Sequence, residues 1–178
     1  MKTFKKLFCT LFIAIFSTTF ICAQEVEKDV PYVPTRPAVV DAMLKLAKVT
    51  SKDVVYDLGC GDGRIVISAA KDYGATGTGI DIDPQRIKEA KENAIKAEVT
   101  DKVKFVQGNL FKTDFSKASV VTLYLLPAIN LKLRPQLLKQ LKPGTRIVSH
   151  AFDMGDWKPE QTMEVDGATI YFWTVPAK

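Results

Sequence analysis

The segment Asp57-Leu-Gly-Cys-Gly-Asp-Gly63 combines carboxylates with glycines in a spacing that suits a small ligand. A β-favouring run, VVY, precedes the segment and a helical pattern follows it, which predicts a turn between a strand and a helix. Gly59 and Gly61 carry no side chain, so a ligand could lie against their backbone. A turn of this kind usually binds a nucleotide or a related molecule.

The acidic residues narrow the choice of ligand. Dinucleotide-binding turns follow the pattern G-x-G-x-x-G, whereas the third glycine here, Gly63, comes one residue earlier. Asp57 and Asp62 would repel a pyrophosphate, which binds to N–H groups and positive charge. The turn also lacks the Lys-Ser/Thr pair of a P-loop. These features favour an adenosine-type ligand that has no phosphate and carries positive charge, and S-adenosylmethionine fits that description.

A second acidic position supports this interpretation. The next β-favouring run ends in GIDID, which places Asp81 about 20 residues after the turn, where a ribose-binding carboxylate is expected. The alternative is a glycine-rich turn with solvated aspartates. Two features in the spacing that the binding mechanism requires are more specific than a glycine turn alone.

The remaining pattern predicts the elements that position these residues. β-favouring runs at 53–58, 76–82, 102–109, 119–126 and 145–150 alternate with helical patterns at 37–48, 63–74 and 84–97. A further helical pattern at 130–144 contains Pro135, which predicts a short segment and then a helix from Pro135. The last two runs, joined by Asp166-Gly167, predict a hairpin. The expected fold is therefore α/β, a mostly parallel Rossmann-like sheet that ends in an antiparallel hairpin.

The N-terminal residues differ from the rest of the chain. Residues 1–23 have three early lysines, an apolar run and small residues before Gln24, the layout of a cleaved signal peptide. The alternative is an uncleaved membrane anchor, and in both cases the flanking charges place the domain outside the cytoplasm. Residues 24–36 are polar and proline-rich, which predicts an extended arm before a domain at 37–178.

Charge and cysteine content limit the function classes. The net charge of +5 falls to +2 without the three lysines of the leader, and no basic patch with interleaved aromatics is present, so nucleic-acid binding is not favoured. Cleavage would leave Cys60 as the one cysteine, which excludes an internal disulfide. No His/Cys/Asp cluster has the spacing of metal ligands, and no metal is expected.

From about residue 32 to 175 the sequence resembles the class I S-adenosylmethionine-dependent methyltransferases, whose sheet has seven strands. DLGCGDG resembles the first motif of that family, GIDID the acidic end of its second strand, and GNL, at 108–110, the end of its third strand. YVPT, YLLP, LRPQL, PGTRIVSHAF and DWKP are similar to a narrower family of small mitochondrial and bacterial protein-lysine methyltransferases. Known members of that family methylate the ATP synthase c subunit and the adenine nucleotide translocase.

The resemblance implies a role for each candidate residue. Asp57, Gly59 and Gly61 would hold the methionine part of the cofactor, and Asp81 would bind the ribose. The adenine would lie among Ile82, Asn109 and Leu110, although close relatives commonly have Asp in place of Asn109. On the arm, Tyr32 and Thr35 would close over the methionine end. The candidates for the substrate channel are Tyr124 and Pro127.

The family resemblance implies transfer of a methyl group to the lysine of a protein, with two alternatives left open. One is a small-molecule methyltransferase, and the other is a module that binds an adenosine compound without catalysis. An export signal favours the latter, because S-adenosylmethionine is made inside cells. The one histidine, His150, suggests a general base, but a structural role is favoured because the resemblance assigns no function to it.

Overall fold

The computed structural model describes residues 30–177, so the leader and the first part of the arm lie outside the described residues. Seven strands form one sheet in the order β3-β2-β1-β4-β5-β7-β6. Its five parallel strands are β1 (Val54–Leu58), β2 (Thr76–Asp81), β3 (Val103–Gln107), β4 (Val120–Leu123) and β5 (Arg146–His150). Strand β7 (Ala168–Thr174) pairs antiparallel with both β5 and β6 (Gln161–Val165). The predicted fold class is thereby confirmed.

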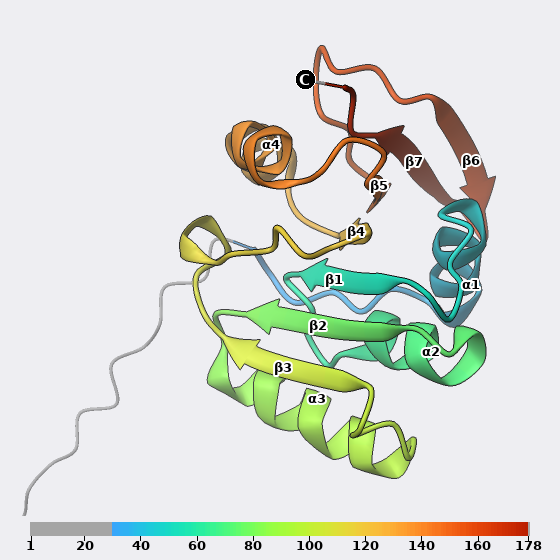
Figure 1. The fold of residues 1–178 in the computed structure, drawn as a ribbon, viewed down its shortest axis with the longest axis vertical. Coiled ribbons are helices and arrows are strands. Elements are labelled where there is room, and N and C mark those ends of the chain that lie inside the picture. Colours follow the sequence, from blue (N-terminus) through green and yellow to red (C-terminus); the bar gives the residue numbers. More distant parts are fainter. Residues whose placement is uncertain (1–29, 178) are drawn as a thin grey trace, which may run out of the picture.

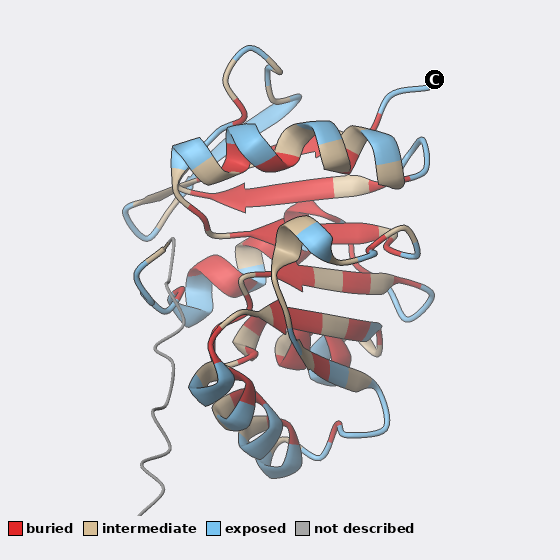
Figure 2. Ribbon diagram, turned by 90° about the vertical axis from the view of Figure 1, so that its left-hand side faces the viewer, coloured by how far each residue is buried: buried red, intermediate tan, exposed pale blue. Residues whose placement is uncertain are grey.

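Helices cover both faces of the sheet (Figure 1). On one face lie α1 (Pro37–Leu46), α2 (Arg64–Tyr73) and α3 (Pro84–Lys96), and on the other lies α4 (Pro127–Gln140). The alternation of side chains along β1 explains the two layers, because Val55 packs with the α1 and α2 side while Leu58 packs with α4. The central strands are consequently buried along most of their length (Figure 2).

Helix α4 differs from the sequence prediction. It runs without interruption from Pro127 through Pro135, rather than beginning at Pro135. Pro135 cannot donate a hydrogen bond to the carbonyl of Leu131, which normally weakens a helix. Packing offsets this loss here, because Leu133 and Leu137 on either side of Pro135 are completely buried. Pro127, proposed as a substrate-channel residue, occupies the first turn of this helix, where the fixed φ of proline is favourable.

The C-terminal hairpin has the predicted turn. Asp166 and Gly167 have φ values of 51° and 72°, and both values lie in the left-handed region that a two-residue hairpin turn requires. In the resulting β6–β7 pair, β7 lies beside β5 and β6 forms the edge of the sheet. Among residues 30–177 no helix has the length and apolar character needed to cross a bilayer.

Candidate active site

A pocket lies at the carboxyl ends of the parallel strands, next to the reversal of strand order between β1 and β4. This is the position where open α/β sheets bind ligands. The pocket encloses about 990 Å³, including its open mouth, and the arm at residues 30–35 forms one of its walls. Its lining includes every predicted site residue except Pro127, namely Tyr32, Thr35, Asp57, Gly59, Gly61, Asp81, Ile82, Asn109, Leu110 and Tyr124.

The glycine turn forms the floor of this pocket. Gly59 and Gly61 have φ values of 88° and 52°, which L-residues with a side chain rarely adopt. The space is also limited, because a Cβ atom at Gly61 would lie 2.5 Å from Cε2 of Tyr32. The N–H groups of Gly59 and Cys60 both donate to the carbonyl of Ile80, which ties the turn to the end of β2. Glycine therefore allows both the shape of the turn and the close approach of the arm.

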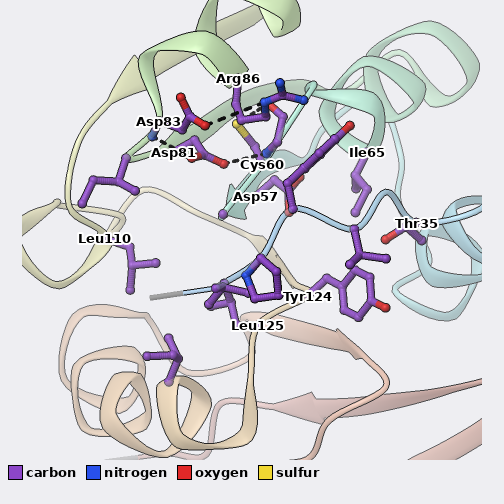
Figure 3. A pocket seen from close by; sticks show the side chains of 18 of the residues that line it. Thr35, Asp57, Cys60, Ile65, Asp81, Asp83, Arg86, Leu110, Tyr124 and Leu125 are labelled. Carbon is purple, nitrogen blue, oxygen red and sulfur yellow. Dashed lines mark hydrogen bonds and ion pairs between the residues drawn. The ribbon is translucent and has the colours of Figure 1, made fainter. Parts of the chain in front are cut away.

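Asp81 organises the neighbouring loops. Its Oδ2 accepts a hydrogen bond of 2.8 Å from the N–H of Gly61, and its Oδ1 accepts one of 2.9 Å from the N–H of Asp83. Figure 3 shows this side chain along one side of the pocket, close to Asp83 and Arg86. Each carboxylate oxygen can accept a second hydrogen bond, so Asp81 can also receive the hydroxyls of a ribose.

Asp57 is a carboxyl group at the end of β1 that is only 2% exposed. It accepts a hydrogen bond of 2.8 Å from the hydroxyl of Thr122 on β4. Burial raises its pKa to about 7, despite this hydrogen bond, and the nearby charges of Asp81 and Asp62 raise it further. No basic side chain of the described residues counteracts this effect. A positive charge on a ligand would therefore be stabilised beside Asp57 and would favour its ionised form.

The part of the pocket where the adenine is expected has a more apolar lining than the part around Asp57. Ile82, Leu110 and Phe111 line it, and these side chains suit the faces of an adenine ring. The Oδ1 atom of Asn109 accepts a hydrogen bond of 2.9 Å from the N–H of Phe111 and thereby starts the short 3₁₀ helix η1 (Leu110–Lys112). That bond occupies one lone pair of Oδ1, and the predicted contact with the adenine amine would use the second lone pair. This contact stays a prediction.

The arm is held over the glycine turn by two arginines that the sequence analysis did not single out. The guanidinium of Arg86 lies 4.4 Å from the ring centroid of Tyr32, within the range of a cation–π interaction. Arg64 donates from Nη1 to the carbonyl of Thr35 and forms an ion pair with Asp62. The sequence shows that Arg64 lies next to the glycine turn, but nothing in it indicates that Arg64 and Arg86 contact the arm.

An aromatic group forms the end of the pocket next to β4. Tyr124 follows β4, and its ring lies against that of His150 with 3.7 Å between the centroids and 32° between the planes, while the Phe152 centroid lies 6.4 Å from that of Tyr124. We call Tyr124, His150 and Phe152 the aromatic wall. Burial lowers the pKa of His150, and the charge of Arg36 lowers it further, so the imidazole is held in its neutral form. His150 lies directly behind Tyr124, which lines the pocket, and the structural role favoured by the sequence stays a prediction.

The chemistry of these residues fits S-adenosylmethionine. A buried carboxyl without a cationic partner suits its positive charges, a backbone without side chains allows close approach, and an apolar end suits adenine. Asp57, Gly59 and Gly61 would hold the methionine part, Asp81 the ribose, and Ile82 and Leu110 the base. No group of three or more His, Cys, Asp or Glu side chains in the described part of the chain could hold a metal ion.

Comparison with known proteins decides the family. The ANTKMT methyltransferase domain matches residues 57–161, which is more than half of the chain. The chain belongs to this methyltransferase family. A protein-lysine N-methyltransferase from Saccharolobus islandicus is 48% identical to it over 151 residues, covering 82% of this chain and 94% of that protein. The human ATP synthase c-subunit lysine N-methyltransferase is 29% identical over 144 residues, covering 81% of this chain and 61% of that protein.

A solved structure supports both the fold and the cofactor. An RNA methyltransferase from Salinibacter ruber, in complex with S-adenosyl-L-homocysteine, is 58% identical, with a TM-score of 0.81 and coverage of 82% of this chain and 95% of that one. This chain is an S-adenosylmethionine-dependent methyltransferase with a class I sheet. The names of these similar proteins disagree about the acceptor, so the acceptor must be argued from the site.

Proposed function

We propose that this methyltransferase transfers the methyl group to the amine of a lysine side chain in a protein. The observation that carries the proposal is the aromatic wall at the end of β4. Tyr124 faces the pocket with the ring of His150 tilted by 32° against it, so that the acceptor end is bordered by aromatic surfaces. Such surfaces suit the long apolar stem of a lysine, and aromatic faces also attract its ammonium group.

The reaction requires little from the protein beyond alignment. Bound S-adenosylmethionine supplies a methyl group already activated on a sulfonium. The protein must bring the amine into line with that methyl group and exclude water. A lysine amine must also be neutral to react, and both burial and a nearby positive charge lower its pKa.

An RNA acceptor is the competing proposal, because the Salinibacter ruber protein is named an RNA methyltransferase. Binding RNA requires cations that are free to contact phosphates. The arginines around the pocket are engaged instead: Arg64 pairs with Asp62 and Arg86 pairs with Glu89. Farther out, Arg36 pairs with Asp166 and Arg134 with Asp156. These pairs reduce the number of arginines near the pocket that are free to contact phosphates, which weakens the case for RNA.

The two acceptor classes can be separated by one labelling experiment. Residues 24–178 are incubated with methyl-labelled S-adenosylmethionine and, in parallel, with the protein fraction, the total RNA or the small-molecule extract of the source cells. We expect label that protease releases and nuclease does not, and we expect that Tyr124→Ala greatly reduces it. Label confined to the RNA fraction would contradict the proposal. Label on neither polymer, but on small molecules, would favour the small-molecule alternative.

The cellular location remains a prediction from the sequence. Residues 1–23 lie outside the described residues, and their pattern supports a cleaved leader or a membrane anchor. N-terminal sequencing of the chain made in its own cells separates these two. A start at Gln24 would support export, a start at Met1 in the membrane fraction would support an anchor, and a start at Met1 in the soluble fraction would contradict both.

A further inference from the structure

His150 is the meeting point of two parts of the site that are distant in the sequence. Its Nδ1 atom lies 3.1 Å from the hydroxyl of Thr35, across 115 residues of chain. Its ring lies against that of Tyr124 in the aromatic wall, with 3.7 Å between the ring centroids. Thr35 and His150 are 4% and 7% exposed, so their hydrogen bond is shielded from water and would be difficult to replace with solvent.

Thr35 is part of the arm, which is the segment that covers the predicted cofactor site. Thr35 and Tyr32 lie on the same short arm, and Tyr32 packs directly above Gly61 of the glycine turn. Arg64 holds the arm at the same residue, since its Nη1 donates to the carbonyl of Thr35. Figure 3 shows Thr35 and Tyr124 at the same end of the pocket. The position of the arm is therefore fixed next to the aromatic wall.

The turn that follows His150 at the end of β5 has a strained backbone and is held by several hydrogen bonds. Ala151 has a φ of 65°, an unfavourable value for a residue with a side chain. The turn is held by the hydroxyl of Ser149, which donates to the carbonyl of Phe152 at 2.6 Å, and by Asn130 of α4. Asn130 is completely buried and donates from Nδ2 to the carbonyls of both Phe152 and Asp153. Strained turns persist where the surrounding structure holds them, often next to functional sites.

We propose that His150 is a positioning residue of this methyltransferase, one that joins the arm above the cofactor to Tyr124 through the Thr35 hydrogen bond. When the arm lies over the glycine turn, Thr35 fixes the imidazole, and the imidazole in turn fixes the ring of Tyr124. Cofactor binding beneath the arm and placement of the acceptor wall are therefore coupled. The proposal rests on the methyltransferase function of the site, but its test needs no acceptor.

Binding of S-adenosylhomocysteine, measured by calorimetry, provides the first readout. Thr35→Val and His150→Phe each remove the hydrogen bond and keep most of the shape, and each should weaken binding about three- to tenfold. The double variant should bind no more weakly than either single variant, because the same contact is lost. His150→Asn retains a polar atom near the position of Nδ1 and should recover most of the affinity. Thr174→Val, which removes a hydroxyl bond to Glu160 at the end of β7, is the matched control and should bind as the wild-type chain does.

The second readout uses the fact that the chain contains one histidine. In the untagged protein a single pair of imidazole proton resonances reports on His150, and stacking on Tyr124 should shift these resonances upfield. We expect Thr35→Val to move them toward the values of a free imidazole, and we expect Thr174→Val to leave them in place.

Both measurements can overturn the proposal. It would be wrong if Thr35→Val and His150→Phe bound S-adenosylhomocysteine as tightly as the wild-type chain while only lowering its melting temperature. It would also be wrong if the imidazole resonances were the same in Thr35→Val and the wild-type chain. The lysine acceptor could fail in the labelling experiment while these results held, so the two failures are distinguishable.

Discussion

The cofactor end and the acceptor end of the pocket are built in different ways. At the cofactor end, the glycine turn and Asp81 meet through a hydrogen bond between residues 20 positions apart, and the ends of adjacent strands supply the rest. At the acceptor end, Tyr124 follows β4 and His150 ends β5, and a bond across 115 positions joins His150 to Thr35 of the arm. The cofactor end thus depends on local backbone conformation, whereas the acceptor end depends on how distant segments pack.

This difference suggests a division of labour. At the cofactor end, backbone N–H groups and carboxylates would recognise one small molecule by its charge and its hydroxyls. At the acceptor end, the proposed surface is made of aromatic side chains, and His150 joins that surface to the arm above the cofactor. Similar proteins whose names give a protein lysine and an RNA as acceptors are consistent with this arrangement.

The largest effect on the cofactor end should come from Asp81→Ala. The substitution removes the acceptor for the N–H groups of Gly61 and Asp83 and also the predicted ribose ligand. We expect the Kd for S-adenosylhomocysteine to rise about a hundredfold, the combined loss of two hydrogen bonds to a charged group. Asp114→Ala is the matched control, since Asp114 accepts from the N–H of Ser116 on an exposed turn. Equal binding by the two variants, measured by calorimetry, would contradict the role of Asp81.

At the acceptor end, Tyr124→Ala should lower kcat/KM for methyl transfer to the protein acceptor roughly thirtyfold, because the amine loses the surface that aligns it. The Kd for S-adenosylhomocysteine should change far less. Tyr124→Phe keeps the ring and should recover most of the transfer. If Tyr124→Ala weakened cofactor binding as much as it slowed transfer, the two ends would not be separable.

The raised pKa of Asp57 predicts a pH dependence confined to the cofactor end. Folding is favoured while Asp57 is protonated, so its contribution is complete below pH 4 and is lost as the pH rises through about 7. The unfolding free energy of the ligand-free chain should thus fall from pH 5 to pH 7 with a slope of up to about 1.4 kcal/mol per pH unit.

Asp57→Asn should remove this contribution in denaturant titrations repeated at each pH. Affinity for S-adenosylmethionine should follow the opposite course and rise over the same range, since the bound cation favours the carboxylate. An identical pH dependence in Asp57→Asn and the wild-type chain would show that other groups are responsible.

A smaller effect is expected where the arm meets the glycine turn. Gly61→Ala would bring a Cβ atom to 2.5 Å from the Tyr32 ring, and that partly exposed ring can move aside. We expect S-adenosylhomocysteine to bind about threefold more weakly, together with a loss of about 1 kcal/mol in stability from the left-handed backbone. Gly144 also lies in the left-handed region, with a φ of 84°, but no atom lies within 4 Å of an added Cβ, so Gly144→Ala should lose stability alone. Calorimetry on both variants separates the contact from the backbone strain, and equal affinities would argue against the contact.

The two ends also differ in how far the sequence could predict them. The glycine turn, Asp81 and the Asp166-Gly167 hairpin were predicted because each depends on a local backbone requirement. Helix α4 was expected to start at Pro135, because the sequence shows the lost hydrogen bond but not the buried leucines that offset it. The contacts of His150 with Thr35 and Tyr124 depend on which strands are neighbours, and no spacing in the sequence carries that information.

The most direct test of the proposed acceptor is the chemical identity of the methylated product. After reaction with labelled S-adenosylmethionine and the protein fraction, complete acid hydrolysis and amino-acid analysis locate the label. The proposal predicts that the label elutes as ε-N-methylated lysine and that it is greatly reduced in Tyr124→Ala. Label on a different amino acid, or label that nuclease removes before the hydrolysis, would contradict it.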